Sequence, residues 1–202
     1  MNLDQAVQAP IFKQISKVAK VKEQQAFVIG GFVRDFLLKR SDPKDIDIVT
    51  EGSGIELAEA VAKEYNPRPK VSVFKRFGTA MIRVGNYDLE FVGARKESYT
   101  PDSRKPFVEG GTLEDDQKRR DFTINALAIS LNEENYGELV DPFEGITDLK
   151  KKIIRTPLNP DITYSDDPLR MIRAIRFATQ LNFTIEKESF EAIKKNAQRF
   201  DI

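Results

Sequence analysis

The sequence contains no cysteine and no histidine. Without cysteine there is no disulfide, no thiolate nucleophile and no cysteine-ligated zinc site. Without histidine there is no Ser-His-Asp triad, no imidazole general base and little scope for zinc chemistry. Catalysis by this chain must therefore rest on carboxylates, basic side chains and metal ions that prefer oxygen ligands.

An excess of charge of either sign is also lacking. The chain has 32 Lys and Arg against 32 Asp and Glu, so no overall basic field indicates a nucleic acid, and an RNA site would have to arise from local placement. The longest apolar stretch, Phe27 to Val33, is too short for a bilayer, and the N-terminus has no signal-type apolar core. We expect a cytoplasmic protein with no membrane association and no obligate protein partner.

What is present is the composition of an ordinary folded protein. Hydrophobic residues make up 40% and charged residues 32% of the 202 residues, which excludes a disordered chain. This length is enough for one domain, or for one domain and the start of a second.

Apolar periodicity predicts an alternation of helices and strands in the first half of the chain. Ser53 can cap a helix, and Glu56 would complete a capping box. Gly85-Asn86 is typical of a tight II′ hairpin turn between two strands. The expected elements are a helix over 5–22, a strand over 26–29, a helix over 32–39, a strand over 45–49, a helix over 53–65, and strands over 70–73, 78–84 and 87–92. Together they predict an α+β fold with a mixed sheet.

The second half is less regular. Residues 94–117 carry Pro101, Pro106 and Gly110-Gly111 without an apolar period, which predicts a long loop of functional importance or disorder. We expect a helix over 122–131, a compact segment with a turn over 139–155, and helix from Asp167 onward. The apolar stripe expected on the last helix is Leu169, Ile172, Phe177 and Leu181.

Two acids in the D-I-D-I-V segment are the first candidate site. Asp45 and Asp47 are two apart on a predicted strand, so their side chains share one face. At about 4 Å and an effective dielectric constant near 20, two carboxylates repel by roughly 4 kcal/mol. A divalent cation such as magnesium relieves this repulsion and also binds phosphates. Glu90, on the strand over 87–92, is the candidate third carboxylate; the alternative for the pair alone is a solvated strand edge.

A glycine turn precedes these acids. Gly30-Gly31 lies where a strand turns into a helix, so backbone N–H groups can receive a phosphate there. Arg34 follows within the first helical turn and can bind the same anion with two donors. The pattern is neither the dinucleotide fingerprint nor the P-loop, and simple chain reversal is the alternative.

Four motifs in order resemble the class II CCA-adding tRNA nucleotidyltransferases and the bacterial poly(A) polymerases, which are polymerase-β-like enzymes. They are GGFVRD (30–35) with DIDIV (45–49), RRDFTINALA (119–128), DPFEGITDL (141–149) and DDPLRMIRAIRF (166–177). The resemblance implies a catalytic head over 1–155, with a mixed, mainly antiparallel sheet flanked by helices. It also implies that residues 156–202 begin an all-helical neck, which carries the base-recognition helix and continues beyond residue 202.

The resemblance implies a role for each matching residue. Asp45 and Asp47 correspond to the metal ligands. Asp167 and Arg170 correspond to the pair that reads the Watson–Crick edge of the incoming base, and Asp166 stands where the family usually has Glu. The other implied nucleotide contacts are Gly31, Arg34, Arg120, Asp121, Asn125, Arg173 and Arg176.

Physical chemistry supports the base-reading pair independently. Asp167 and Arg170 are three apart, hence on one helix face, and a carboxylate and a guanidinium together match the amino group and ring acceptors of cytosine or adenine. An ordinary Asp–Arg ion pair on a solvated helix is the alternative.

The implied activity is the addition of C and A to the tRNA 3′ end from CTP and ATP, with two magnesium ions. Residues 94–117 occupy the place of the family's flexible loop, which the resemblance links to the change from C to A addition. A poly(A) polymerase, an enzyme adding only CC or only A, and a non-catalytic RNA- or nucleotide-binding module remain as alternatives.

Overall fold

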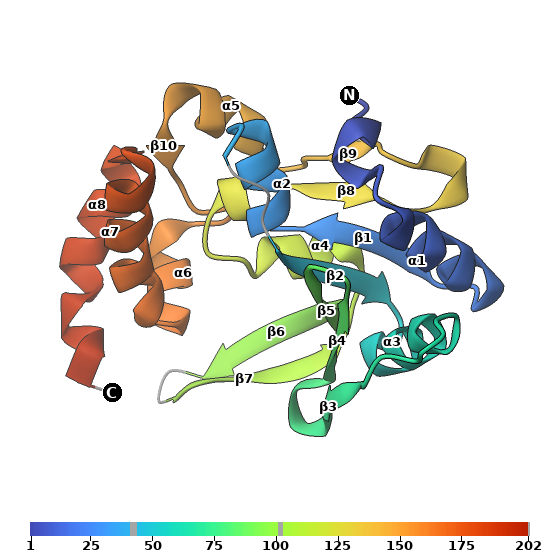
Figure 1. Cartoon of the computed structure of the whole chain (residues 1–202). Helices are drawn as coiled ribbons and strands as arrows, with labels where there is room; N and C mark the ends of the chain where they lie inside the picture. Colours follow the sequence, from blue (N-terminus) through green and yellow to red (C-terminus); the bar gives the residue numbers. More distant parts are fainter. Residues whose placement is uncertain (41–43, 101–102, 202) are drawn as a thin grey trace.

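A seven-stranded sheet forms the centre of the computed structural model, which describes residues 1–40, 44–100 and 103–201 (Figure 1). Its strands are β1 (Gln25–Ile29), β2 (Asp45–Glu51), β3 (Ser72–Phe74), β4 (Thr79–Val84), β5 (Tyr87–Gly93), β8 (Ala128–Ser130) and β9 (Leu139–Val140). They lie in the order β3-β4-β5-β2-β1-β8-β9. Only β2 and β5 run parallel among these neighbours. The predicted α+β fold with a mainly antiparallel sheet is confirmed.

The alternation of side chains along the strands divides the core into two parts. Val28 and Ile48 point into the larger part, which packs beneath the helices of the first half. These helices are η1 (Asp4–Val7), α1 (Pro10–Val21), α2 (Gly31–Leu37) and α3 (Gly54–Lys63). Ile29 and Val49 point to the opposite face, where they form a smaller cluster with Leu113 of α4 (Leu113–Lys118). Asp45 and Asp47 share this second face, since they alternate with Ile46 and Ile48.

Local signals in the first half were predicted well. Ser53 Oγ accepts a hydrogen bond from Glu56 N–H at 3.2 Å, so the cap of α3 is confirmed. The reciprocal half of the capping box is not formed, because the Glu56 carboxylate faces Lys22 Nζ at 3.5 Å. Gly85 has φ +59°, and Asn86 is not left-handed, which agrees with a II′ turn between β4 and β5. The helix expected over 5–22 is divided at Pro10 into η1 and α1.

The prediction of a long loop over 94–117 is wrong. Its described residues form an antiparallel ribbon of β6 (Arg95–Thr100) and β7 (Ser103–Gly110), followed by α4; Pro101 lies outside the described residues. The two strands pair only with each other, and Phe107 and Val108 are exposed. A ribbon that leaves such side chains in solvent needs no apolar alternation, so its pattern did not indicate strands.

The prediction of a helix over 122–131 is also wrong. This segment forms the short turn η3 (Thr123–Asn125) and then β8, which lies between β1 and β9. Ala128, Ile129 and Ser130 are all buried, so the segment is apolar on both faces. An apolar run of this length does not distinguish a buried strand from a buried helix.

The C-terminal part is mostly helical and lies at one end of the sheet (Figure 1). After η4 (Glu133–Asn135), its elements are α5 (Gly145–Lys151), β10 (Ile153–Ile154), α6 (Pro160–Asp166), α7 (Leu169–Leu181), β11 (Thr184–Ile185), α8 (Lys187–Asn196) and η5 (Ala197–Asp201). Helix from Asp167 onward is therefore interrupted by β11, which pairs with β10. Within the described part of the chain, no helix has both the length and the apolar character needed to cross a bilayer.

The apolar stripe expected on α7 is wrong in part. Phe177 is buried and Leu181 is half-buried, but Leu169 and Ile172 are exposed. The helix instead buries Arg170 with Met171, Ala174 and Phe177. The inner face therefore combines apolar side chains with Arg170, whose Nη2 donates to Arg119 O in the head.

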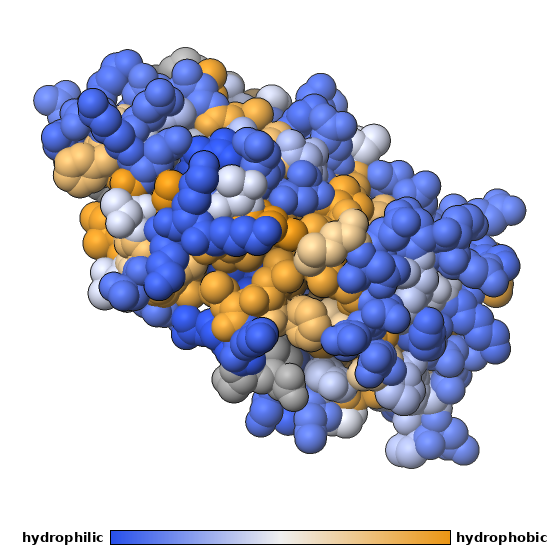
Figure 2. Space-filling view, turned by 90° about the horizontal axis from the view of Figure 1, so that it is seen from above, coloured by the Kyte–Doolittle hydropathy of each residue, from blue (hydrophilic) through white to orange (hydrophobic). Residues whose placement is uncertain are grey.

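An apolar hollow opens between η1, α1 and α2 on the face seen in Figure 2. Its volume is about 610 Å³, and Phe12, Phe32 and Phe36 are among its lining residues. Phe12 and Phe32 belong to the larger part of the core, so this hollow lies on the other side of the sheet from Asp47.

We predict that Phe122→Ala lowers the free energy of unfolding by about 3–5 kcal/mol, the usual cost of deleting a buried ring. Phe122 is fully buried and meets Phe177 of α7 edge-on, with centroids 5.8 Å apart. Urea denaturation measures the loss. Phe190→Ala is the matched control because Phe190 is 46% exposed, and it should change the value by less than about 0.5 kcal/mol. Equal losses in the two variants would contradict the role of Phe122.

Candidate active site

Three acids lie side by side on one face of the sheet. The parallel register of β2 and β5 places Asp47 beside Glu90 and Asp45 beside Asp88. Paired residues in neighbouring strands project to the same face, so Asp45, Asp47 and Glu90 share it. Asp45 is exposed, whereas Asp47 and Glu90 are half-buried. The structure thus brings together the acids that the sequence singled out.

These carboxylates lack a neutralising partner. Among the described residues, none makes a hydrogen bond or an ion pair with the carboxylate of Asp45, Asp47 or Glu90. Burial raises the pKa of Asp47, as do Asp116 and Asp45, while Arg120 and Arg119 act against the rise. Burial also raises the pKa of Glu90, and the charge of Asp47 adds to this effect.

Unpaired carboxylates of this kind fit a divalent cation. In the described part of the chain, no group of three or more acids lies close enough to hold an ion unaided. Magnesium usually takes only one or two protein carboxylates and completes its shell with water and phosphate oxygens. The donor set of Asp45 and Asp47 therefore suits a metal that is shared with a nucleotide.

Gly30 lies directly against Asp47. Its backbone has φ +82° and ψ −132°, a conformation open in practice only to glycine. A Cβ atom there would lie 3.1 Å from Arg120 Nη1 and 3.4 Å from Asp47 Oδ2. Gly30 N–H donates to Leu127 O at 3.0 Å, so an anion would have to bind the amides from Gly31 onward.

Arg34 was expected to reach the same anion, and its donors are engaged within the protein. Nε and Nη2 bind the two carboxylate oxygens of Asp35 at 2.9 and 2.8 Å. Nη1 donates to Asn125 Oδ1 at 2.7 Å, and the residue is buried. In this arrangement Arg34 positions α2 against η3.

A chain of polar contacts continues from Arg34 to α7. Asn125 Nδ2 donates to Asp121 Oδ1 at 3.0 Å. The other oxygen of Asp121 accepts from Arg173 Nε at 2.7 Å and lies 2.6 Å from Arg173 Nη2. Four of the predicted site residues thus form one connection between the sheet and the C-terminal helices.

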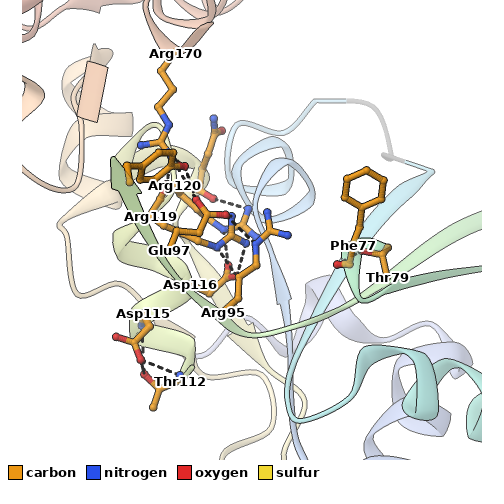
Figure 3. A network of polar contacts seen from close by, with 12 residues as sticks. Phe77, Thr79, Arg95, Glu97, Thr112, Asp115, Asp116, Arg119, Arg120 and Arg170 are labelled. Carbon is orange, nitrogen blue, oxygen red and sulfur yellow. Dashed lines mark hydrogen bonds and ion pairs between the residues drawn. The ribbon is translucent and has the colours of Figure 1, made fainter. Parts of the chain in front are cut away.

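Two buried acids, which sequence reasoning missed, organise the basic side chains around the site (Figure 3). Asp116 on α4 is fully buried, and its two oxygens bind Arg119 Nε and Arg120 Nε, each at 3.0 Å. The spacing of three and four residues is typical of helical ion pairs and is a signal that could have revealed this contact. Because Asp116 holds Nε, Arg120 presents Nη1 toward Gly30 and Asn125 O.

Glu97 on β6 is the second buried acid, with a side chain 4% exposed. It lies 2.9 Å from Arg95 Nε, 3.4 Å from Arg119 Nη1 and 3.9 Å from Arg170 Nη2. The Tyr99 hydroxyl donates to it at 2.6 Å, and burial raises the pKa of Tyr99. No sequence signal pointed to Glu97, because its partners come from three separate segments.

Of the predicted base-reading residues, Arg170 lies in the first turn of α7, whereas Asp167 precedes the helix with an extended backbone (φ −138°, ψ 102°). The prediction that the two share one helix face is therefore wrong. Arg170 is buried, and its Nη2 donates to Arg119 O at 2.7 Å and to the Tyr99 hydroxyl at 3.3 Å. Asp167 Oδ1 accepts from Leu169 N–H at 3.2 Å. Arg176 is exposed, with its guanidinium carbon 5.9 Å from the centre of the Phe177 ring. Burial raises the pKa of Asp166, and the Arg170 charge opposes this.

Comparison with known proteins finds relatives over most of the chain. The family described as the poly A polymerase head domain matches residues 26–155. An A-adding tRNA nucleotidyltransferase of Aquifex aeolicus is 44% identical over 85% of this chain and 20% of its own length. A CCA-adding enzyme of Lactobacillus helveticus is 41% identical over 85% of this chain and 41% of its own length. The chain therefore spans about a fifth to two fifths of these relatives.

The fold of this chain is also similar to that of a solved structure. The Thermotoga maritima CCA-adding enzyme, complexed with tRNA, superposes with a TM-score of 0.82 at 31% identity. The match covers 98% of this chain and 46% of that protein.

We predict that Asp47→Asn raises the melting temperature near neutral pH when divalent ions are removed with EDTA. The raised pKa of Asp47 means that the folded state binds the proton more tightly than the unfolded chain. Stability therefore falls as the pH rises through the interval between the two pKa values, and asparagine escapes this loss. The advantage should shrink below that interval, which thermal melts across acidic and neutral pH can follow.

Asp161→Asn is the control, because it should change the melting temperature in the opposite direction. A hydrogen bond from Lys195 lowers the pKa of this exposed acid, so its replacement should lower the melting temperature at neutral pH. A loss of stability in Asp47→Asn at neutral pH would show that Asp47 has a structural partner.

Proposed function

Because this chain belongs to the family of the poly A polymerase head domain, we propose that it is the catalytic head of an enzyme that adds nucleotides to the 3′ end of tRNA. One observation carries the proposal. Asp45, Asp47 and Glu90 stand without counterions beside Gly30 and Arg120, which is the arrangement a nucleotide triphosphate and its metal ions require. We assign residues 1–155 to the head and residues 156–202 to the start of the neck.

The residues have separate tasks in this proposal. Asp45 and Asp47 would hold magnesium, and Glu90 is the third acid of the site. Two bound magnesium ions supply the charge that activates the RNA 3′-hydroxyl and neutralises the triphosphate. Arg120 presents its Nη1 beside Gly30 and binds the triphosphate there, because Asp116 holds its Nε in place. The amides from Gly31 onward face the same anion.

Base selection is assigned to Asp167, just before α7, and to Arg170 in its first turn, with CTP and ATP as substrates. The carboxylate accepts from an amino group and the guanidinium donates to ring acceptors, which favours C and A over U and G. Contacts with Arg119 O and Tyr99 position the Arg170 guanidinium between the head and the ribbon. Arg173 holds Asp121 and thereby places α7 relative to the site.

The activity is tested with the intact protein, CTP, ATP and two tRNAs, one that lacks the whole CCA end and one that lacks only the terminal A. Three added nucleotides identify a CCA-adding enzyme, two C or one A a partial enzyme, and a long tail a poly(A) polymerase. No addition overturns the proposal and favours a non-catalytic binding module.

We predict that Asp47→Ala lowers the rate of addition by more than about 100-fold, since even the loss of a group that supports a metal ligand costs about 10- to 100-fold. The rate is measured as the amount of extended tRNA that forms over time on a denaturing gel. Asp161→Ala, at an exposed acid on α6, should add nucleotides at the wild-type rate. Retained addition in Asp47→Ala would contradict the role of Asp47 as a metal ligand. A large fall in the melting temperature of this variant would show that Asp47 is needed for the fold.

We predict that Arg170→Ala changes base choice more than it weakens nucleotide binding. The measured quantity is the ratio of kcat/KM for CTP over UTP and for ATP over GTP. Arg170→Lys keeps the charge but not the two-pronged donor, so it should also lose selectivity while keeping the fold. Unchanged ratios in both variants would contradict the base-reading role.

A further inference from the structure

An open shelf lies next to the three acids on the same face of the sheet. The strand registers place Met81 beside Glu90, and Glu90 beside Asp47, in one row across β4, β5 and β2. Phe74 of β3 pairs with Thr79 of β4 and belongs to the same face. Met81 is 37% exposed and Phe74 45% exposed, so this part of the face is open to solvent.

A hollow of about 710 Å³ adjoins this shelf, where β5 ends and the β6–β7 ribbon begins. Its lining includes Arg76, Phe77, Arg95, Val108 and Glu109, together with several glycines. A volume of this order is typical of sites for nucleotide-sized ligands. Gly93, which ends β5 three residues after Glu90, also lines the hollow, so the hollow lies at the end of the strand that carries the third acid.

In-line transfer decides which molecule approaches from this side. The triphosphate site, Gly30 and Arg120, lies on the β1 side of Asp47, and Glu90 lies on the β5 side. The attacking oxygen and the leaving pyrophosphate must lie on opposite sides of the reacting phosphorus. If pyrophosphate leaves toward Gly30 and Arg120, the RNA 3′-hydroxyl arrives from the β5 side. The preceding nucleotides then extend over β4 toward the hollow.

We propose that this hollow binds the RNA nucleotide just before the reacting 3′ residue, with its base stacked on Phe77 and its phosphate beside Arg76. The inference rests on the proposed function. The Phe77 ring is 62% exposed and stands across from Arg95, apart from the network of buried ion pairs (Figure 3). Stacking tolerates any base, which suits a strand whose 3′ sequence changes with each addition.

The charges of the lining agree with an RNA phosphate. Arg95 is held by Glu97 at 2.9 Å, and Glu109 contributes one negative charge to the hollow. Arg76 makes no ion pair with a described residue, and its guanidinium carbon lies 5.9 Å from the centre of the Phe77 ring. It is therefore the cation of the lining that remains for a phosphate.

Steady-state kinetics of the intact protein on truncated tRNA test the assignment. Phe77→Ala should raise the KM for tRNA by about 5- to 100-fold, the effect of one lost base stack, and leave the KM for the nucleotide within about two-fold. Phe77→Trp should restore the wild-type KM. Phe190→Ala, a comparably exposed phenylalanine on α8, should have no effect. Arg76→Gln should lower the salt dependence of tRNA binding by about one phosphate contact.

Primers with a single abasic nucleotide identify the stacked base. At the penultimate position, the lesion should raise the KM of the wild type and have no further effect in Phe77→Ala. Equal penalties in both proteins at every position, or an unchanged KM in Phe77→Ala, would overturn the inference while the proposed function stands. If the wild type adds no nucleotide to any primer, the proposed function fails and this inference falls with it.

Discussion

Electrostatic repulsion among acids that the protein leaves unneutralised is the constraint on which the site depends. The charge of Arg120 opposes the rise in the pKa of Asp47 without cancelling it, and the buried carboxylate of Asp116 binds the Nε of this arginine. The arginine is thereby kept from closing an ion pair with Asp47. Because the acids keep their lone pairs free, the folded protein has a place where a cation is favourable.

The second structural theme is the use of buried polar contacts to join parts that are distant in sequence. Glu97 gathers arginines from the ribbon, from α4 and from α7, and Asp121 binds Arg173. Breaking a buried charge pair leaves its partner desolvated, which costs much more than the intact pair contributes. Contacts of this kind therefore set the position of α7 relative to the sheet, and with it the position of the base-reading residues relative to the acids.

Features governed by short-range rules could be predicted from the sequence. The period of two along a strand places Asp45 and Asp47 on one face, and the cap of α3 and the turn at Gly85 depend only on neighbouring residues. The ribbon over residues 95–110 and the strand β8 could not be recognised in this way. The ribbon needs no apolar face, and β8 is apolar on both faces, so neither has the alternation that identifies a strand.

The sequence by itself determined the chemistry available to this protein: carboxylates and arginines without histidine or cysteine, and a pair of aspartates behind a glycine turn. Only the tertiary structure decided which charges neutralise one another. It pairs Arg34 with Asp35 and Asn125, turns Arg170 toward the head, and leaves Asp47 without a partner. The reason is physical: the energy of a charge depends on its burial and on its nearest neighbours in space, and most of those neighbours come from distant segments of the chain.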